Sequence, residues 1–315
     1  MVGMNRLRGL SLVKSNKTII TARQPRNAKW LQQVSAYLFL LPAILVFSAF
    51  AWFPLLNSVV MSFQNIKLGG ESTWVGLENY DRMLNDPLFV QSWGNSLQFA
   101  LLSILIGFII PILAAIAVNE MRQIKGFFRL VYFLPNLIPV VIYLLVWRRI
   151  YAPEGGFLNS LLALFGVEPH LWLQDPTTVK PAMIVILTWA NFGATMLIYL
   201  AALQDLSHEL YEAAEIDGAS PLQRIRHITL PYLTTTMKLL LILQFLAVVQ
   251  IFTEPFLLTT GGPANNSLTP VLAIYRKAFA DNDYGVASAW SVTLVVFLAI
   301  FSLIYQRMSR SQRSE

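Results

Sequence analysis

The amino-acid sequence predicts an all-α, polytopic membrane protein with six transmembrane helices. Hydrophobic residues make up 56% of the 315 residues and charged residues only 13%, whereas a soluble domain has roughly 25% charged residues. Six long runs carry few or no charges, and about 20 such residues are enough for a helix to cross a bilayer. The basic residues also concentrate in alternate connecting segments, as expected for a chain that crosses a membrane repeatedly.

The six apolar runs define the predicted spans, at residues 34–63, 92–119, 130–147, 181–204, about 232–258 and 284–306. A buried core helix is the alternative for any single run, but six runs in one chain favour membrane spans. The first run is too long and too far from the N-terminus to be a secretory signal. In the fifth run only fifteen residues separate Lys238 from Glu254. We therefore expect Lys238 to snorkel toward one membrane surface and Glu254 to lie near the other.

The distribution of basic residues orients the predicted spans. Sixteen of the twenty-three Lys and Arg residues lie before the first run, in or beside the second and fourth connecting segments, and after the last run. The positive-inside tendency therefore places both termini in the cytoplasm. We divide the chain into a basic cytoplasmic arm (1–33), a six-span transmembrane domain (34–306) and a cytoplasmic tail (307–315). The net charge of +6 follows from this topology and does not indicate nucleic-acid binding.

A compact polar segment at about 205–231 interrupts the apolar sequence between the fourth and fifth runs. Ser207 is placed to cap a helix that continues to about residue 216, and Gly218 suits a helix end that needs a left-handed residue. Ser220 and Pro221 are typical of a new helix start, and Pro231 is expected to open the fifth span. The segment thus predicts a helix, a turn and a helix on the cytoplasmic face. A hairpin this short is marginal unless it docks against something, either neighbouring spans or a cytoplasmic partner.

The spacing of residues in this segment resembles the EAA signature of ABC importer permeases. Glu212-Ala213-Ala214 is followed after three residues by Gly218, after nine more by Ile228, and after one more by Leu230-Pro231. In that family the short helix sits in a cleft of an ATPase subunit and transmits the closing of the ATPases to the membrane helices. The resemblance therefore implies the type I ABC importer permease fold. It implies a coupling role for Glu212, Ala213, Ala214, Gly218, Ile228, Leu230 and Pro231.

Other stretches are similar to the carbohydrate-uptake branch of these permeases, the maltose and glycerol-phosphate type. They include "NYDRMLNDPLFVQSWGNSLQF", "FFRLVYFLPNLIPVVIYLLVWRRIYAPEGGFLN" and "LLTTGGPANNSLTPVLAIYRKAFADNDYGVASAWS". The likeness covers about residues 36–306, in the compact six-span form and of the first of two permease types. It implies a second permease subunit, two ATPase subunits that bind ATP and Mg²⁺, and an extracytoplasmic solute-binding protein. The implied solute is a sugar, an oligosaccharide or a sugar-like molecule.

Polar side chains inside the predicted spans are candidates for a solute pathway, because such groups tend to face a bundle interior or a cavity. The candidates are Asn136, Thr188, Asn191, Gln244 and Gln250. Thr188 and Asn191 share a helix face, whereas a regular helix would place Gln244 and Gln250 about 120° apart. Helix packing is the alternative role for each amide. The resemblance supports the amides, because the maltose pocket of that family draws on the matching third, fourth and fifth spans.

The sequence contains no pattern that indicates catalysis or metal binding in this chain. It has no cysteine, its three histidines lack metal-ligand spacing, and neither a phosphate-binding GxxxxGK[ST] loop nor an HExxH motif occurs. We therefore expect a non-catalytic subunit that imports solute by ATP-driven alternating access, with ATP hydrolysis on a partner. A secondary transporter that works without ATPases is the alternative. It usually carries intramembrane acids or inverted repeats, and here the single acid near a span is Glu254. A membrane scaffold would not need the EAA spacing.

Overall fold

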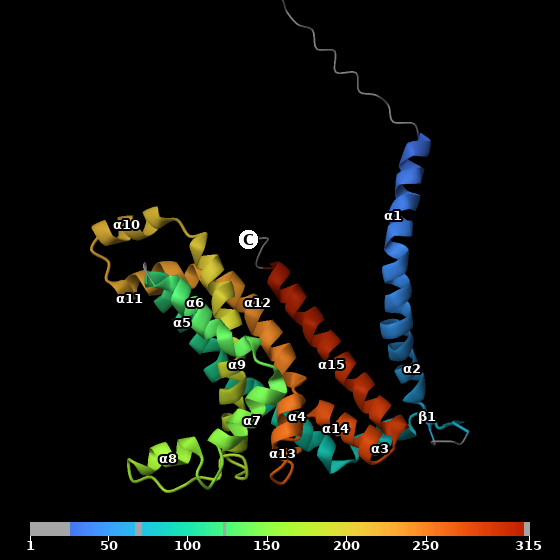
Figure 1. The fold of residues 1–315 in the computed structure, drawn as a ribbon. Helices are drawn as coiled ribbons and strands as arrows, with labels where there is room; N and C mark the ends of the chain where they lie inside the picture. Colours follow the sequence, from blue (N-terminus) through green and yellow to red (C-terminus); the bar gives the residue numbers. More distant parts are fainter. Residues whose placement is uncertain (1–25, 67–70, 122–123, 312–315) are drawn as a thin grey trace, which may run out of the picture. The chain divides into compact units, whose positions relative to one another are not determined.

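The computed structural model describes residues 26–66, 71–121 and 124–311, and these residues are almost entirely helical (Figure 1). The only strands in the described residues are β1 (Gln64–Asn65) and β2 (Thr73–Trp74), which form one short antiparallel pair. The chain forms two compact units, 1–55 and 56–315. The predicted all-α fold is confirmed.

The first unit contains α1 (Arg26–Phe47), the π-helical turn η1 (Ser48–Trp52) and the start of α2 (Phe53–Met61). The apolar stretch Tyr37–Met61 is long enough to cross a membrane, and none of it is buried. Its exposed aliphatic and aromatic side chains suit a lipid environment. Residues 1–25 of the predicted basic arm lie outside the described residues. Residues 26–33, which we assigned to the same arm, form the first turns of α1.

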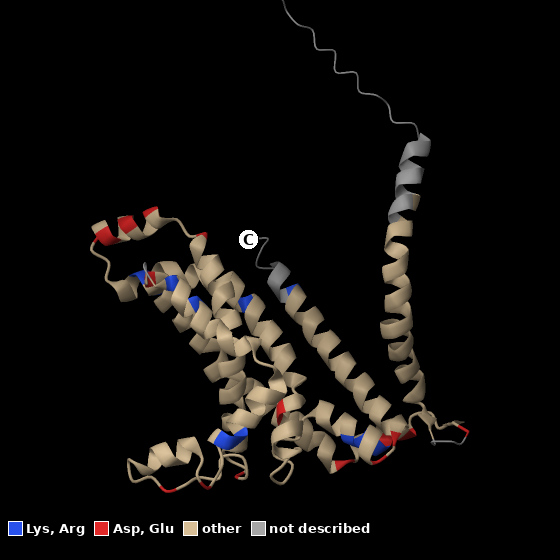
Figure 2. Cartoon of the chain, in the orientation of Figure 1, with Lys and Arg blue, Asp and Glu red and all other residues tan. Residues whose placement is uncertain are grey.

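Within the described residues, five helices are long and apolar enough to cross a membrane. They are Tyr37–Met61, Pro87–Glu120, Val179–Gln204, Pro221–Val249 and Tyr284–Arg307. Figure 2 shows that the long helices of the second unit carry few charges along their length. The count reaches six only if the bent pair of helices Lys125–Leu137 and Val140–Ile150 forms a single span.

The third predicted span is broken, which corrects the expectation of a continuous helix. The helix α6 (Lys125–Phe133) leads into a 3₁₀ turn, η3 (Leu134–Leu137), and α7 (Val140–Ile150) then leaves at a bend of 96°. Pro139 explains the break: it lacks an N–H donor and forces the residue before it out of the helical region. Ile138 accordingly has φ −80° and ψ 127°.

The second and fourth spans form the centre of the second unit. The second span consists of α4 (Pro87–Leu102), the π-helical turn η2 (Ser103–Phe108) and α5 (Ile109–Glu120), and the fourth is α9 (Val179–Gln204). Buried side chains of α5 and α9, including Ala115, Met196 and Tyr199, pack in one apolar cluster with Leu233. The helix α9 also lies so close to α6 that a Cβ atom at Gly193 would be 1.9 Å from the Tyr132 carbonyl oxygen.

Short helices occupy the segments between the spans. They are α3 (Glu78–Leu84), α8 (Phe157–Ala163), α13 (Thr253–Thr259), α14 (Pro270–Tyr275) and the π-helical turn η5 (Arg276–Ala280). Buried asparagines order two of these segments. Asn95 donates to the carbonyls of Asn265 (2.7 Å) and Leu268 (2.8 Å). Asn159 donates to the His170 carbonyl and accepts from the Trp172 indole. These long connections are therefore folded structure.

Two predicted boundaries differ from the structure. The fifth span ends at Val249, the last residue of α12 (Leu230–Val249), and not near Leu258, because the chain turns at Gln250 and starts α13. The last helix, α15 (Tyr284–Ser311), continues beyond residue 306 into the predicted tail. Residues 312–315 lie outside the described residues.

Candidate functional site

The polar segment folds into the helix and turn that its sequence predicts. The helix α10 spans His208–Ile216, and the Ser207 side chain accepts a hydrogen bond from the Glu209 N–H (3.2 Å). The helix ends at Ile216, and Gly218 in the turn after it has a φ of +78°, in the left-handed region. The next residue, Ala219, donates from its backbone to the Ala214 carbonyl at 2.9 Å. In this glycine-terminated helix end, a backbone N–H beyond the helix donates to a carbonyl group of the last turn that would otherwise lack a partner.

The second helix of the segment also begins as predicted, but it continues without a break into the membrane. It starts with α11 (Pro221–Arg224), capped by a reciprocal pair of hydrogen bonds between Ser220 and Gln223. It passes through the π-helical turn η4 (Ile225–Thr229) into α12, so that Pro221–Val249 is one long helix. Pro231 therefore lies inside the fifth span and does not open it. Because Pro231 has no N–H, the preceding turn is widened, and Leu230 donates to Ile225 five residues back.

Side-chain contacts hold α10 against the start of this long helix. The Tyr211 and Thr229 hydroxyls lie 2.7 Å apart, and the Arg224 guanidinium lies 3.5 Å from the Glu215 carboxylate. A hollow of about 320 Å³ between the two helices is lined by Ala214, Gly218, Ile228 and their neighbours. The structure thus brings together members of the EAA pattern that are fourteen residues apart in the sequence.

The outer surface of the segment that contains α10 and α11 is open and carries both acids and large apolar side chains. Glu212, Ala213, Gly218 and Pro231 are exposed, whereas Ala214, Ile228 and Leu230 are half-buried. Figure 2 shows acidic residues along α10. The side chains of Ile216 and Leu222 are 86% and 74% exposed. Sequence reasoning missed these two residues, although apolar residues inside a polar segment were a visible signal.

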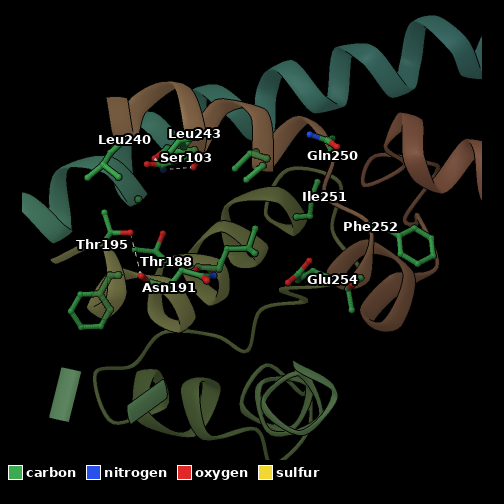
Figure 3. A pocket seen from close by; sticks show the side chains of 17 residues that line it. Ser103, Thr188, Asn191, Thr195, Leu240, Leu243, Gln250, Ile251, Phe252 and Glu254 are labelled. Carbon is green, nitrogen blue, oxygen red and sulfur yellow. Dashed lines mark hydrogen bonds between the residues drawn. The ribbon is translucent and has the colours of Figure 1, made fainter. Parts of the chain in front are cut away.

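A second candidate site is a cavity of about 470 Å³ inside the second unit (Figure 3). Its walls come from η2, α9, α12, the turn that follows α12 and the start of α13. Four of the five predicted pathway residues line it: Thr188, Asn191, Gln244 and Gln250. The fifth, Asn136, does not line the cavity. Its amide lies 3.5 Å from the Ala190 carbonyl and joins the broken third span to α9.

The end of α12 explains why Gln244 and Gln250 line the same cavity despite their helical spacing. Gln250 follows the last helical residue of α12, and the residues after it turn away and also line the cavity, so the cavity extends around the end of the helix and meets both glutamines. The Gln244 amide nitrogen donates hydrogen bonds to the Ser103 carbonyl oxygen at 2.8 Å and to the Ser103 hydroxyl oxygen at 2.5 Å. Gln244 therefore has a packing role as well as a lining role.

Asn191 and Gln250 have free hydrogen-bonding capacity in the cavity. Their amide nitrogens donate to carbonyls four residues back, Leu187 and Leu246, each at 2.9 Å. Among the described residues, no donor reaches the side-chain oxygen of either residue. Both side chains are exposed to the cavity and not to the packed core. They can accept hydrogen bonds from hydroxyl groups of a solute.

Glu254 is a cavity residue that sequence reasoning placed only near a membrane surface. It lies in α13, beyond the last residue of the fifth span, and is 7% exposed. The Tyr143 hydroxyl from α7 donates to its carboxyl group at 3.2 Å. Burial raises the pKa of the Glu254 carboxyl group above its ordinary value, and the Tyr143 hydrogen bond opposes this rise. Its position in the sequence beside an apolar run was the available signal.

The chain is similar over most of its length to known membrane transport proteins. Residues 107–314 match the family described as "Binding-protein-dependent transport system inner membrane component". The arabinooligosaccharides transport system permease protein AraP of Bacillus subtilis is 31% identical over 92% of this chain and 93% of its own length. A bacterial ABC transporter that imports the acidic polysaccharide alginate has a chain of similar structure. It has a TM-score of 0.81 and 27% identity, and the match covers 91% of this chain and 99% of that one.

A second structure of an alginate ABC transporter, in complex with an alginate pentasaccharide-bound periplasmic protein, has a TM-score of 0.79 and 27% identity. The match covers 90% of this chain and 96% of the other. The family model spans more than half of the chain, and the aligned relatives span nearly all of it. This chain therefore belongs to the family of binding-protein-dependent transport system inner membrane components, as a multi-pass permease subunit of an ABC importer.

Proposed function

We propose that this subunit forms part of the translocation pathway for a sugar, an oligosaccharide or a sugar-like solute, and moves it into the cytoplasm by ATP-driven alternating access. The observation that carries this proposal is the cavity in which Thr188, Asn191, Gln244 and Gln250 meet. A cavity with a few convergent polar groups among apolar ones is typical of a small-molecule site. The name of the arabinooligosaccharide permease supports the sugar class.

The proposed assembly contains a second permease subunit, two ATPase subunits that bind ATP and Mg²⁺, and an extracytoplasmic binding protein. The alginate transporter in complex with a periplasmic protein supports the last of these partners. The segment 205–231 is proposed to dock into the ATPases, with Glu212, Ala213, Ala214, Gly218, Ile228, Leu230 and Pro231 as its coupling residues. Exposure of Ile216 and Leu222 supports a docking role, because large apolar side chains open to water favour contact with a partner.

The proposed orientation places both termini and α10 in the cytoplasm, and it predicts the result of cysteine labelling. The natural chain has no cysteine, so a single cysteine introduced at an exposed position shows on which side of the membrane that position lies. Glu168, between α8 and α9, and His208, at the start of α10, are both exposed. Glu168→Cys should react with an impermeant maleimide added outside intact cells. His208→Cys should react only after the cells are opened, and the reverse pattern would contradict the orientation.

Replacing Asn191 by leucine should raise the KM for uptake about 10-fold or more, because each lost hydrogen bond to a solute is worth about 1 kcal/mol and the desolvated partner adds to the cost. The assembled importer, reconstituted with its binding protein, is the material for this measurement. Asn136→Leu is the matched control, since Asn136 contacts Ala190 and does not line the cavity.

The control is expected to lower the thermal stability of the complex and to leave KM near the parent value. An unchanged KM in Asn191→Leu, or equal KM effects in both variants, would assign Asn191 to helix packing.

A further inference from the structure

The cavity carries one ionisable side chain, and that side chain is an acid. Its lining consists of the four predicted polar residues, Ser103, Thr195, Thr253, Gly107, a set of apolar residues and Glu254. No Lys, Arg or His is present in this lining. A solute in the cavity would therefore meet no positively charged side chain from the described part of this subunit.

Glu254 is placed to act on a solute because, among the described residues, the one side chain that hydrogen-bonds to its carboxyl group is the neutral Tyr143. Among the described residues it makes no ion pair, and the Tyr143 hydroxyl contacts one carboxyl oxygen. Figure 3 shows Glu254 at the cavity together with Asn191 and Gln250. A buried carboxyl group is stabilised by a cation or by hydrogen-bond donors. The Tyr143 hydroxyl and the Glu254 backbone supply part of this stabilisation, and a solute in the cavity can supply further donors or a positive charge.

Two amide oxygens of the cavity are also free to accept hydrogen bonds. The side-chain oxygens of Asn191 and Gln250 are acceptors with no donor from the described residues, while their nitrogens already donate to backbone carbonyls. Hydroxyl and ammonium groups donate hydrogen bonds to such oxygens, whereas carboxylate groups can only accept them. Each primary amide also keeps a second N–H that could donate to an anion, so selection against anions rests on the charge of Glu254 and on the absence of Lys, Arg and His from the described lining.

We propose that Glu254 makes this cavity select neutral or positively charged sugar-like solutes against anionic ones. The inference rests on the proposed function, because it specifies the solute class of that same cavity. It distinguishes this protein from the structurally similar transporter that imports the acidic polysaccharide alginate. A solute carboxylate a few ångströms from Glu254, in an environment of reduced dielectric, would experience repulsion equivalent to about a 100-fold loss of affinity.

Binding to the complete importer in lipid nanodiscs, without the binding protein, tests this inference independently of delivery. The probes are three disaccharides of similar size: maltose as the neutral one, diglucosamine as the cationic one and digalacturonate as the anionic one. Their affinities are measured by titration calorimetry for the parent and for Glu254→Gln, which keeps the shape of the side chain and removes its charge. Glu168→Gln is the matched control, since that exposed acid does not line the cavity.

The parent should bind maltose and diglucosamine at least 10-fold more tightly than digalacturonate. Glu254→Gln should reduce the preference for maltose over digalacturonate about 10-fold, and Glu168→Gln should leave it unchanged. Equal or tighter binding of digalacturonate by the parent would overturn the inference, as would an unchanged preference in Glu254→Gln or no binding of any probe. ATP-dependent uptake that favours digalacturonate would overturn this inference alone. Absence of ATP-dependent uptake for every solute supplied with its binding protein would instead defeat the proposed function.

Discussion

Replacement of Gly218 by valine is expected to abolish uptake while the chain still inserts into the membrane. Gly218 has φ +78°, and a β-branched residue in this region costs about 1–2 kcal/mol. An added Cβ atom would meet nothing within 4 Å. The substitution therefore acts through the backbone of the turn, where it changes the angle between α10 and α11, while the added Cβ atom itself has open space. Gly94→Val is the control, because Gly94 also has open space around it but lies within α4.

The Glu212→Ala substitution tests the same segment, 205–231, by removing one negative charge from its exposed surface. The Glu212 side chain is exposed and makes no hydrogen bond or ion pair with the described residues. Alanine is a strong helix former, so the fold of α10 should be kept. A charge-assisted contact to a partner would be lost, and such contacts are worth roughly 1.5–3 kcal/mol. We expect at least a 10-fold loss of ATPase retention in a pull-down, whereas Glu71→Ala, at another exposed acid, should retain the ATPases.

The amount of the Gly218→Val and Glu212→Ala chains in purified membranes shows whether both variants insert normally. Parent-like ATPase retention and uptake in both Gly218→Val and Glu212→Ala would show that the segment 205–231 is not the coupling element.

Gly193→Val is expected to have the largest effect on stability. A Cβ atom at this position would lie 1.9 Å from the Tyr132 carbonyl oxygen and 2.9 Å from the Phe133 nitrogen. Both are backbone atoms, so rotation of a side chain cannot relieve the contact. The helices α6 and α9 would have to separate beside the break in the third span, and overpacking of this kind costs about 1–3 kcal/mol or more.

The measurement for Gly193→Val is the thermal unfolding of the purified complex, together with its yield from membranes. We expect a Tm several degrees lower and a reduced yield. Gly126→Val is the matched control, because Gly126 lies in α6, the helix that Gly193 of α9 approaches, and a Cβ atom there would have nothing within 4 Å. Parent-like stability of Gly193→Val would contradict the close approach of α6 and α9.

Local chemistry explains which parts of the fold could be predicted from the sequence. The cap at Ser207, the helix end at Gly218 and the capping box at Ser220 are each formed by residues no more than five positions apart, so the local sequence specifies their geometry. Apolar length similarly identified the continuous spans. The prolines at 135 and 139 were also visible, but the 96° bend depends on the packing of α6 and α7 in the folded protein.

The cavity was only partly predictable for a related reason. Thr188 and Asn191 share a face of a regular helix, so their neighbourhood followed from spacing. Gln250 and Glu254 line the cavity because α12 ends at Val249, within an apolar sequence that gives no stop signal. Asn136 was a candidate because of its polarity, yet its hydrogen bond to Ala190 places it in a helix contact. Tertiary packing therefore decided which polar residues face the cavity.

The measurement that tests the central claim most directly is solute uptake into proteoliposomes that contain ATP and Mg²⁺, with external binding protein. The two permease subunits are reconstituted with and without the ATPase subunits. In a parallel set of proteoliposomes, an ion gradient is imposed and ATP is left out. The account predicts uptake only when ATP and the ATPases are both present. Uptake by the permeases alone, driven by the ion gradient, would contradict it and would identify a secondary transporter.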